Sequence, residues 1–194
     1  MQGNDIKLAA RLSQLGTETA FAVSQEAAKL QESGTKVFPF HIGDLNIPTP
    51  KCVIDAMNKA IQEGKTGYCA GAGILPLRKQ LADTIGEKRG VKYSPSNVSV
   101  QSGGKPVITK FLMSVLEAGD EVLYPSPGYP IYESQIQYLG GVKKPYIYRE
   151  TPNGFELDLE YLKSLITPKT KIFIYNNYSN PTGIFVAEVL SEFG

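Results

Sequence analysis

The second half of the chain alternates between strand-like and helix-like segments, and this alternation constrains the fold more than any other feature. From Asn97 onward, short runs rich in β-branched and aromatic residues are separated by amphipathic stretches of helical period. Such alternation is typical of an α/β layer with a largely parallel sheet. Strands are expected at Val98–Gln101, Glu121–Tyr124, Val142–Tyr148 and Lys171–Tyr175. Helices are expected at Pro106–Glu117, Ile131–Leu139, Asp158–Ile166 and Val186–Phe193, with a turn at Thr151–Gly154.

The first half of the chain is predicted to be mainly helical, with loops between the helices. Apolar residues recur there at helical spacing, so helices are expected at Asp5–Gly16, Thr17–Glu32, Lys51–Glu63 and Leu77–Gly90. The alternating apolar residues of Lys36–Ile42 predict a short strand. An irregular loop with prolines follows at Gly43–Pro50, and a loop rich in glycine and alanine surrounds Tyr68.

The charged residues are balanced and dispersed along the chain. The 20 Lys+Arg and 19 Asp+Glu residues leave a formal net charge of +1, with no block of like charges. This pattern gives no electrostatic footprint for nucleic acid or for an anionic membrane surface. No apolar stretch approaches the length of a spanning helix, and Met1–Gly16 lacks the apolar core of a signal peptide. We therefore expect a cytoplasmic protein that binds neither nucleic acid nor membranes.

Few side chains of this sequence are suited to carry catalysis by themselves. The only histidine is His41, which we expect to be packed or hydrogen-bonded, so a hydrolase triad is set aside. Cys52 and Cys69 are isolated, which predicts reduced thiols and no metal-ligand spacing. A chain with so few reactive groups points toward a cofactor that brings its own reactive atoms.

A glycine turn between the first predicted strand and its helix has the character of a phosphate cradle. In the segment Ser102–Pro106, the amides around Gly103, Gly104 and Lys105 lie at the start of a helix, where an anion is favoured. The motif is neither GxGxxG nor GxxxxGK[ST], which disfavours a dinucleotide or a P-loop nucleotide. A tight strand-to-helix turn explains it equally well when it is taken alone. The helix that follows is apolar nearly all round and is expected to be buried.

Further candidate groups follow later strands, where open α/β sheets place their ligands. The proline-rich turn Pro125–Tyr132 presents Tyr129 as a rigid aromatic plate, although taken alone the motif is better explained by a packed tyrosine in a proline turn. The turn Asn180–Gly183 orients the Asn180 amide, although taken alone it is only a turn. Together with the phosphate cradle, these groups can hold a flat, phosphorylated aromatic cofactor.

The order and spacing of these motifs resemble the class I/II aminotransferases, which belong to fold type I of the pyridoxal 5′-phosphate (PLP) enzymes. The resemblance extends over nearly the whole chain and includes relatives that act on aspartate, alanine or diaminopimelate. The matching motifs are Gly43–Pro50, Gly64–Tyr68, Gly73–Arg78, Ser102–Lys105, Pro127–Tyr132 and Asn180–Gly183.

The resemblance implies a fold, a cofactor and a class of substrates. The fold is an α/β architecture in which residues 1–47 form an N-terminal helical arm and part of the small domain. Residues 48–194 then form the first half of the mixed, mostly parallel sheet of the PLP-binding large domain. The cofactor is PLP, the substrates are an amino acid and a 2-oxo acid, and the full-length protein is expected to be a homodimer. The resemblance does not choose among aspartate, alanine, aromatic and diaminopimelate donors.

The same resemblance implies roles for particular residues. Gly43 lies with its backbone near the substrate carboxylate, and Tyr68 reaches the cofactor phosphate of the neighbouring subunit. The amides of Gly104 and Lys105, beside Gly103, contact the phosphate. The remaining implied roles are stacking of Tyr129 on the pyridine ring, a hydrogen bond from Asn180 to the 3′ oxygen, and a structural role for Arg78.

Two departures from the family pattern are visible. Leu45 and Asn46 stand where many members have Pro-Asp, and Tyr178 and Ser179 replace the more usual Pro-x before the Asn-Pro-Thr-Gly turn. Both departures lie on the substrate side of the implied site. They therefore bear on substrate identity more than on cofactor binding.

The resemblance places no catalytic residue within this chain. In the family, the Schiff-base lysine, its aspartate partner and the substrate arginines all lie downstream of the Asn-Pro-Thr-Gly turn, and Lys105 matches the phosphate loop instead. We therefore expect the chain to be the N-terminal part of a longer product, or a truncated one, and to be inactive alone. Later strands would fill the gap between Val98–Gln101 and Lys171–Tyr175, so strand edges and an apolar face of Pro106–Glu117 are expected to be exposed.

Other interpretations remain open at this point. A fold type I lyase or synthase, such as a carbon–sulfur lyase or a relative of aminocyclopropane carboxylate synthase, would share the cofactor pocket. A non-catalytic, truncated aminotransferase-like protein would bind PLP weakly or pair with a full-length partner through the Tyr68 loop.

Overall fold

The computed structural model describes residues 6–15, 19–40, 42–43, 45–152, 154–187 and 189. These residues form two compact units, each of which is described by itself. One unit combines Met1–Thr19 with Lys105–Gly194 and is called the sheet unit here. The other, Ala20–Gly104, is called the helical unit. The predicted division at residue 47 concerns domains of the whole family fold and stays a prediction.

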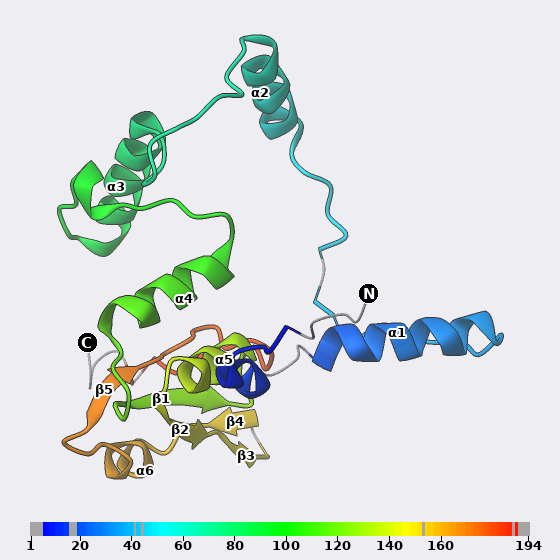
Figure 1. The fold of residues 1–194 in the computed structure, drawn as a ribbon, viewed down its shortest axis with the longest axis vertical. Coiled ribbons are helices and arrows are strands. Elements are labelled where there is room, and N and C mark those ends of the chain that lie inside the picture. Colours follow the sequence, from blue (N-terminus) through cyan, green and yellow to red (C-terminus); the bar gives the residue numbers. More distant parts are fainter. Residues whose placement is uncertain are drawn as a thin grey trace. The chain divides into compact units, whose positions relative to one another are not determined.

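The sheet unit is built on a three-stranded sheet with the order β2-β1-β5 (Figure 1). The central strand β1 (Glu121–Ser126) pairs in parallel with β2 (Val142–Ile147) and with β5 (Thr170–Phe173). Parallel neighbours need a crossover, and the helices α5 (Ile131–Tyr138) and α6 (Leu159–Ser164) lie in the two connections. Three of the predicted strands and these two helices are therefore confirmed, with ends that differ by at most two residues.

The two faces of β1 are covered by different elements, because side chains alternate along a strand. Val122 and Tyr124 pack with residues of α5 and of α4 (Gly104–Val115) in one cluster, called the front cluster. Its buried members are Leu112, Leu116, Val122, Tyr124, Tyr132 and Ile136. Leu123 packs on the opposite side in the back cluster, whose other buried members are Tyr146, Tyr148, Leu157, Leu162 of α6, Ile184, Val186 and Val189. The central strand is thus buried on both faces.

A short antiparallel hairpin follows β2 in the chain. Its strands are β3 (Arg149–Thr151) and β4 (Gly154–Glu156), and Arg149 pairs with Asp158 at 3.3 Å. The sequence predicts the turn but not the strands, because each strand is only three residues long. The Asp158 carboxylate accepts a hydrogen bond from the amide of Tyr161 at 3.1 Å and so caps α6.

The two outer strands of the sheet have different edges. β2 carries Lys143, Lys144 and Pro145, and proline has no N–H to offer to a neighbouring strand. Lys143 also pairs with Glu133 of α5 at 2.6 Å. β5 carries no proline, and among the described residues its only strand neighbour is β1.

The helical unit contains the remaining helices. They are α1 (Thr19–Glu32), α2 (Lys51–Gln62), α3 (Leu75–Arg89) and the 3₁₀ turn η2 (Pro95–Asn97). These α-helices confirm the predicted ones within two residues, except for residues 17 and 18, which lie outside the described part. α3 ends at Gly90, which adopts a left-handed conformation with φ of 63°. No residue of α2 is buried.

Three predicted elements are wrong within the described residues. Lys36–Ile42 forms no strand where it is described. Phe40 is 93% exposed, so the alternating apolar residues do not form a buried face. His41 lies outside the described residues. Val98–Gln101 also forms no strand, because its backbone bonds to a loop, with the Val100 amide donating to the Ala72 carbonyl at 2.9 Å. The helix expected at Asp5–Gly16 is reduced to the 3₁₀ turn η1 (Ala10–Gln14), which has no side-chain cap at Ala9.

The helix expected at Pro106–Glu117 is present as α4, but it is not buried all round. Leu112 and Leu116 are buried in the front cluster, whereas Val107, Phe111 and Met113 are about half exposed or more. An exposed apolar face of this helix is thus observed, as expected from the resemblance. The helix predicted at Val186–Phe193 lies largely outside the described residues.

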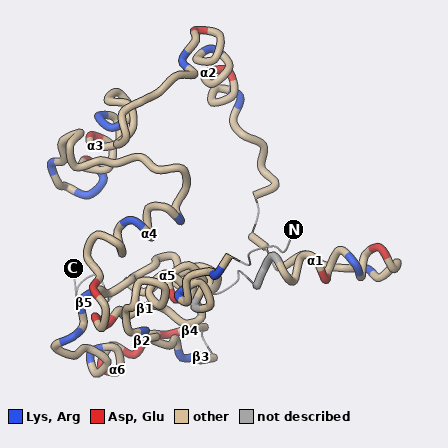
Figure 2. The backbone as a smooth tube through the Cα atoms, viewed as in Figure 1, with Lys and Arg blue, Asp and Glu red and all other residues tan. Residues whose placement is uncertain are grey.

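The distribution of charged residues and the length of the helices can both be followed in the described part of the chain (Figure 2). Lysine, arginine, aspartate and glutamate are interspersed over both units (Figure 2). No helix in the described part of the chain is long and apolar enough to cross a membrane.

Burial of tyrosines in the sheet unit predicts a loss of stability at high pH. Burial, reinforced by Glu133, raises the pKa of Tyr124 to about 12, and burial also raises the pKa of Tyr146. An unfolded tyrosine has a pKa of about 10, so the folded state retains these protons more strongly than the unfolded state. The stabilisation is complete below pH of about 10 and is lost as the pH rises toward about 12.

Urea unfolding followed by circular dichroism at a series of alkaline pH values, with tyrosinate absorbance at 295 nm, checks this expectation. Tyr124→Phe is expected to make stability fall less steeply above pH of about 10. Ionisation of every tyrosine near its ordinary pKa, without unfolding, would contradict it.

Candidate functional site

Tyr129 and Asn180 follow neighbouring strands of the sheet. Tyr129 lies in the loop after β1, and Asn180 lies in the turn that follows β5. β1 and β5 are parallel, so both segments leave the sheet at its carboxyl edge. Open α/β sheets bind ligands at this edge. The topology therefore places these two predicted site residues at the same edge of the sheet unit.

The loop that carries Tyr129 is held by a close approach of two backbone segments. A Cβ atom on Gly128 would lie 2.1 Å from the Pro125 carbonyl oxygen, so no other residue fits without moving the backbone. The half-buried Tyr129 ring packs against the front cluster. It meets the Tyr132 ring edge-to-face, with the ring centroids 5.8 Å apart and an interplanar angle of 88°. Burial raises the pKa of Tyr132, and Tyr129 adds to the increase. The aromatic plate is thus fixed by packing.

The turn around Asn180 is held by its own backbone. The Ser179 amide donates to the Ile184 carbonyl at 2.9 Å, and the Gly183 amide donates to the Ser179 carbonyl at 2.7 Å. The backbone amide of Asn180 donates to Oδ1 of Asn176 at 2.8 Å. Asn180 itself is exposed, and no hydrogen bond of its side chain occurs among the described residues. Its side-chain amide is therefore available to a ligand.

Two hydroxyl groups next to Asn180 are buried without a partner. Neither Oγ of Ser179 nor Oγ1 of Thr182 has a hydrogen bond in the described part of the chain, and Ser179 is only 2% exposed. A buried hydroxyl without a partner costs about 1–3 kcal/mol. The turn thus carries polar groups that are left for a partner other than the described residues. Sequence analysis missed both hydroxyls as site groups, since only the polar character of the segment marked them.

The start of α4 leaves open space where a side chain would stand. Gly103 has φ of 101°, which accounts for glycine at that position. Gly104 has no such backbone requirement, and a Cβ atom on it would meet no described atom within 4 Å. A glycine near the start of a helix, where the backbone conformation does not require glycine, leaves the first amides of that helix accessible to an anion. Lys105, exposed, is the next residue of α4.

The remaining predicted site residues belong to the helical unit. Gly43 is exposed beside Asp44, which lies outside the described residues. Tyr68 is fully exposed in the loop between α2 and α3. Because each unit is described by itself, the places of Gly43, Tyr68, Gly103 and Gly104 relative to Tyr129 stay predictions.

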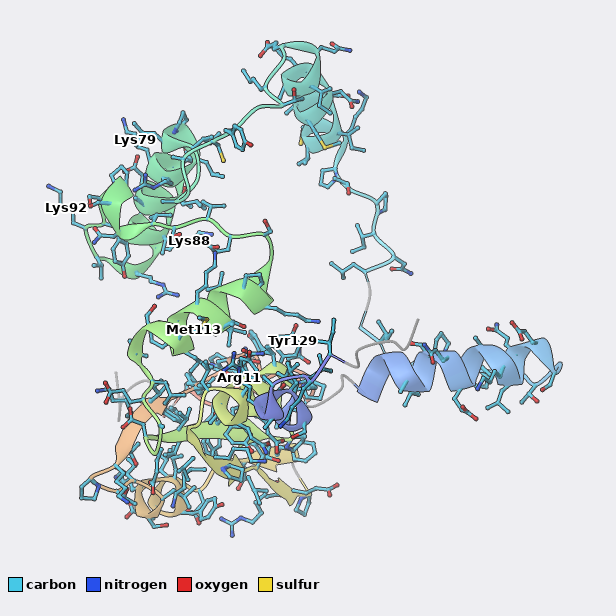
Figure 3. The ribbon with its side chains drawn as sticks, viewed as in Figure 1. Arg11, Lys79, Lys88, Lys92, Met113 and Tyr129 are labelled. Atoms are coloured by element: carbon cyan, nitrogen blue, oxygen red, sulfur yellow. The ribbon has the colours of Figure 1, made fainter. Side chains whose placement is uncertain are left out.

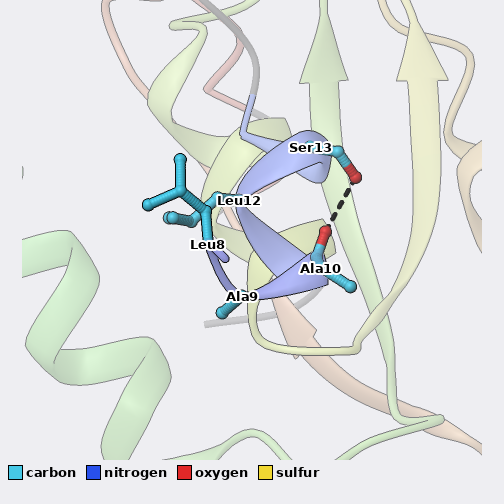
Figure 4. A pocket seen from close by; sticks show the side chains of 5 residues that line it. All are labelled: Leu8, Ala9, Ala10, Leu12 and Ser13. Atoms are coloured by element: carbon cyan, nitrogen blue, oxygen red, sulfur yellow. Dashed lines mark hydrogen bonds between the residues drawn. The ribbon is translucent and has the colours of Figure 1, made fainter. Parts of the chain in front are cut away.

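An open groove of about 460 Å³ lies elsewhere in the sheet unit, along η1 (Figure 4). Its only side-chain polar group, the Ser13 hydroxyl, donates to the Ala10 carbonyl at 2.7 Å. A groove without a charged or free polar group is not suited to a phosphorylated ligand. Its lining residues are Leu8, Ala9, Ala10, Leu12 and Ser13.

Comparison with known families shows to which family this chain belongs. The family model "Aminotransferase class I and II" matches residues 35–188. The chain belongs to the class I and II aminotransferases. The resemblance inferred from the motifs is thereby confirmed.

Relatives with known names support the same family. The chain is 36% identical over 181 residues to a probable aspartate/prephenate aminotransferase of Aquifex aeolicus. This alignment covers 93% of the present chain and 46% of the relative. It is 34% identical over 190 residues to an aspartate aminotransferase of Geobacillus stearothermophilus, covering 97% and 48%. The chain thus spans about half the length of the relatives that it matches.

Solved structures of aminotransferases have the same fold. An alanine aminotransferase from Pyrococcus furiosus superposes with a TM-score of 0.88 at 28% identity, covering 96% of this chain and 48% of that one. A Thermus thermophilus aspartate aminotransferase with maleate gives 0.86 at 32% identity, covering 98% and 49%. The predicted fold class, part of the fold type I architecture of PLP-dependent aminotransferases, is confirmed.

Membership of this family implies PLP as the cofactor, and the described residues fit such a group. PLP is a flat pyridine ring with a phosphate and a 3-oxygen. Within the sheet unit, the fixed ring of Tyr129 suits the pyridine, and the exposed side-chain amide of Asn180 suits the oxygen. Taken by itself, the open space at Gly104 suits a phosphate. The partnerless hydroxyls of Ser179 and Thr182 add polar groups at the same turn.

Arg78 holds together two segments of the helical unit. Its Nε donates to the Val98 carbonyl at 2.9 Å, and its Nη2 donates to the Pro95 carbonyl at 2.6 Å. The half-buried guanidinium therefore ties α3 to the segment that leads toward the glycine turn. These contacts fit the structural role implied by the resemblance.

Removal of these hydrogen bonds is expected to loosen the segment after η2. Arg78→Met should lower stability by about 2 kcal/mol, because hydrogen bonds to a charged donor are lost and two carbonyls lose their partner. Hydrogen exchange at the Val98 amide and urea unfolding measure the effect. Lys79→Met, at an exposed position of the same helix, is the matched control (Figure 3). Equal effects of both substitutions would contradict the assignment.

Proposed function

We propose that this chain provides the phosphate- and ring-binding part of the pocket of a PLP-dependent aminotransferase. The complete protein would transfer an amino group between an amino acid and a 2-oxo acid. The family match and the aminotransferase names of the relatives support this proposal. The comparisons do not favour the lyase or non-catalytic alternatives, because the relatives reported above are named aminotransferases.

The observation that carries the proposal is the convergence of three site segments on the front cluster. α4 is anchored there by Leu112, the loop after β1 by Tyr129, and the end of β5 by Ile174. Packing of these segments against one cluster restricts their relative movement. A rigid support of this kind is what a cofactor site requires.

Each group has a separate task in the proposed site. The amides at Gly104 and Lys105 bind the phosphate at the positive end of α4. Tyr129 holds the ring by stacking, which fixes the plane in which its substituents lie. Asn180 donates from its side-chain amide to the 3-oxygen, and this bond fixes the rotation of the ring.

PLP, when bound, supplies the electron sink for amino-group transfer. We assign no catalytic residue within this chain and propose that the reactive lysine belongs to the part of the family fold that this chain does not span. Gly43, and the unusual Leu45 and Asn46, are proposed to lie on the substrate side. The Tyr68 contact across a homodimer and the cytoplasmic location stay predictions.

A single substitution separates a phosphate site from a structural turn. Gly104→Ala should leave the fold as stable as before or stabilise it by up to about 1 kcal/mol, because alanine favours a helix and meets no neighbour. The added methyl group should nevertheless weaken binding of pyridoxine 5′-phosphate at least tenfold, or by about 1.4 kcal/mol. Isothermal titration and urea unfolding measure the two effects.

The control for this substitution is Ser114→Ala, on the same helix but remote from its start. It should raise helix propensity without changing affinity. If Gly104→Ala binds the phosphate ester as tightly as the unaltered chain, the glycine turn is structural only.

The chain alone is expected to show no transamination. Incubation with PLP, aspartate or alanine, and a 2-oxo acid should give no amino transfer above that of free PLP, because no reactive lysine is assigned here. Amino acid analysis of the products measures the transfer. Robust turnover by the chain would contradict the proposal that the reactive lysine lies outside it.

A further inference from the structure

Two asparagines between β5 and the Asn180 turn direct their side chains back into the backbone. Oδ1 of Asn176 accepts a hydrogen bond from the Asn180 amide at 2.8 Å. Oδ1 of Asn177 accepts one from the Val186 amide at 3.2 Å. Both asparagines are half-buried, whereas Asn180 is exposed. The segment thus has inner asparagines that hold backbone and an outer one that faces away from it.

The inner end of this segment is fixed to the sheet. The Ile174 amide donates to the Leu123 carbonyl at 2.8 Å, and the Ile174 carbonyl accepts a hydrogen bond from the Tyr146 hydroxyl at 3.0 Å. Tyr146 is fully buried, and Leu123 is in the central strand. Asn176 therefore follows closely after a residue that is anchored on both of its backbone groups.

The far side of the turn is also fixed by hydrogen bonds. The backbone conformation of Asn180 then depends on Asn176. Ser179 is held to Ile184 on one side of Asn180, and Gly183 closes the turn on the other. Among the described residues, the backbone amide of Asn180 donates its hydrogen bond to Oδ1 of Asn176. Loss of that acceptor frees the φ angle of Asn180 and hence the direction of its side chain.

We propose that Asn176 is a positioning residue, which sets the backbone of Asn180 so that its side-chain amide points at the 3-oxygen of the cofactor. This inference rests on the proposed function, because it assigns the ligand group that Asn180 meets. Asn176 acts through Asn180 and touches no ligand itself. An acceptor at this side-chain length is the requirement, so aspartate meets it and alanine does not.

Asn177 offers a matched control within the same segment. Its side chain also accepts a backbone hydrogen bond, but from Val186, whose carbonyl accepts from the Tyr175 hydroxyl. Val186 is buried in the back cluster. Asn177→Ala therefore removes a similar hydrogen bond without touching the Asn180 amide.

The experiment compares two ligands on the whole 194-residue chain. Pyridoxine 5′-phosphate carries the ring, the phosphate and the 3-hydroxyl, and its 3-deoxy analogue lacks only that hydroxyl. The unaltered chain should prefer the first compound about fivefold, the ratio expected for one hydrogen bond. Asn180→Ala and Asn176→Ala should each abolish the preference and leave affinity for the 3-deoxy compound unchanged. Asn176→Asp should restore the preference, and Asn177→Ala should keep it.

The outcomes separate the two proposals. If Asn180→Ala loses the preference and Asn176→Ala keeps it, the positioning role is overturned while the proposed cofactor site stands. If Asn176→Ala weakens both ligands equally, its role is general and the inference is also overturned. If the unaltered chain binds neither ligand or shows no preference, the proposed function fails, and this inference with it. Should Asn176→Ala not fold, Asn176→Gln replaces it, because the longer side chain displaces the acceptor and must also abolish the preference.

Discussion

The placement of β1 between two parallel partners is the constraint on which the sheet unit depends. A strand that is buried on both faces needs a cover on each side. α4 and α5 provide one cover, and α6 with Ile184, Val186 and Val189 provides the other. The same pairing aligns the carboxyl ends of β1 and β5. Tyr129 and Asn180 are therefore brought to one edge by the pairing of strands, and not by contacts of their own.

Local periodicity was sufficient for elements whose partners lie within this chain. β1, β2, β5 and the helices beside them were predicted within a few residues, because their apolar faces find a complement in the described structure. Val98–Gln101 has the same local pattern but no strand beside it, and hydrogen bonds to Ala72 and Arg78 replace a ladder. Whether a segment becomes a strand is thus decided by its partner, which a local pattern does not contain.

The candidate site residues that lie in sequence motifs were predictable. Those whose role depends on the folded structure were not. Tyr129 and Asn180 lie in conspicuous proline and glycine turns, so the sequence alone marked them. The role of Asn176 depends on a hydrogen bond across the turn, and that of Ser179 depends on burial without a partner. Both properties arise only after β5 has taken its place beside β1.

The two edge strands of the sheet differ in how well they can pair with a further strand. Along β2, lysines and a proline discourage a further strand, as they do on the outer strands of natural sheets. Along β5, Lys171 is the only charge, and the backbone of that edge has no described neighbour. The edge of β5 is therefore the edge of this sheet that suits pairing with a further strand, whereas the edge of β2 disfavours it.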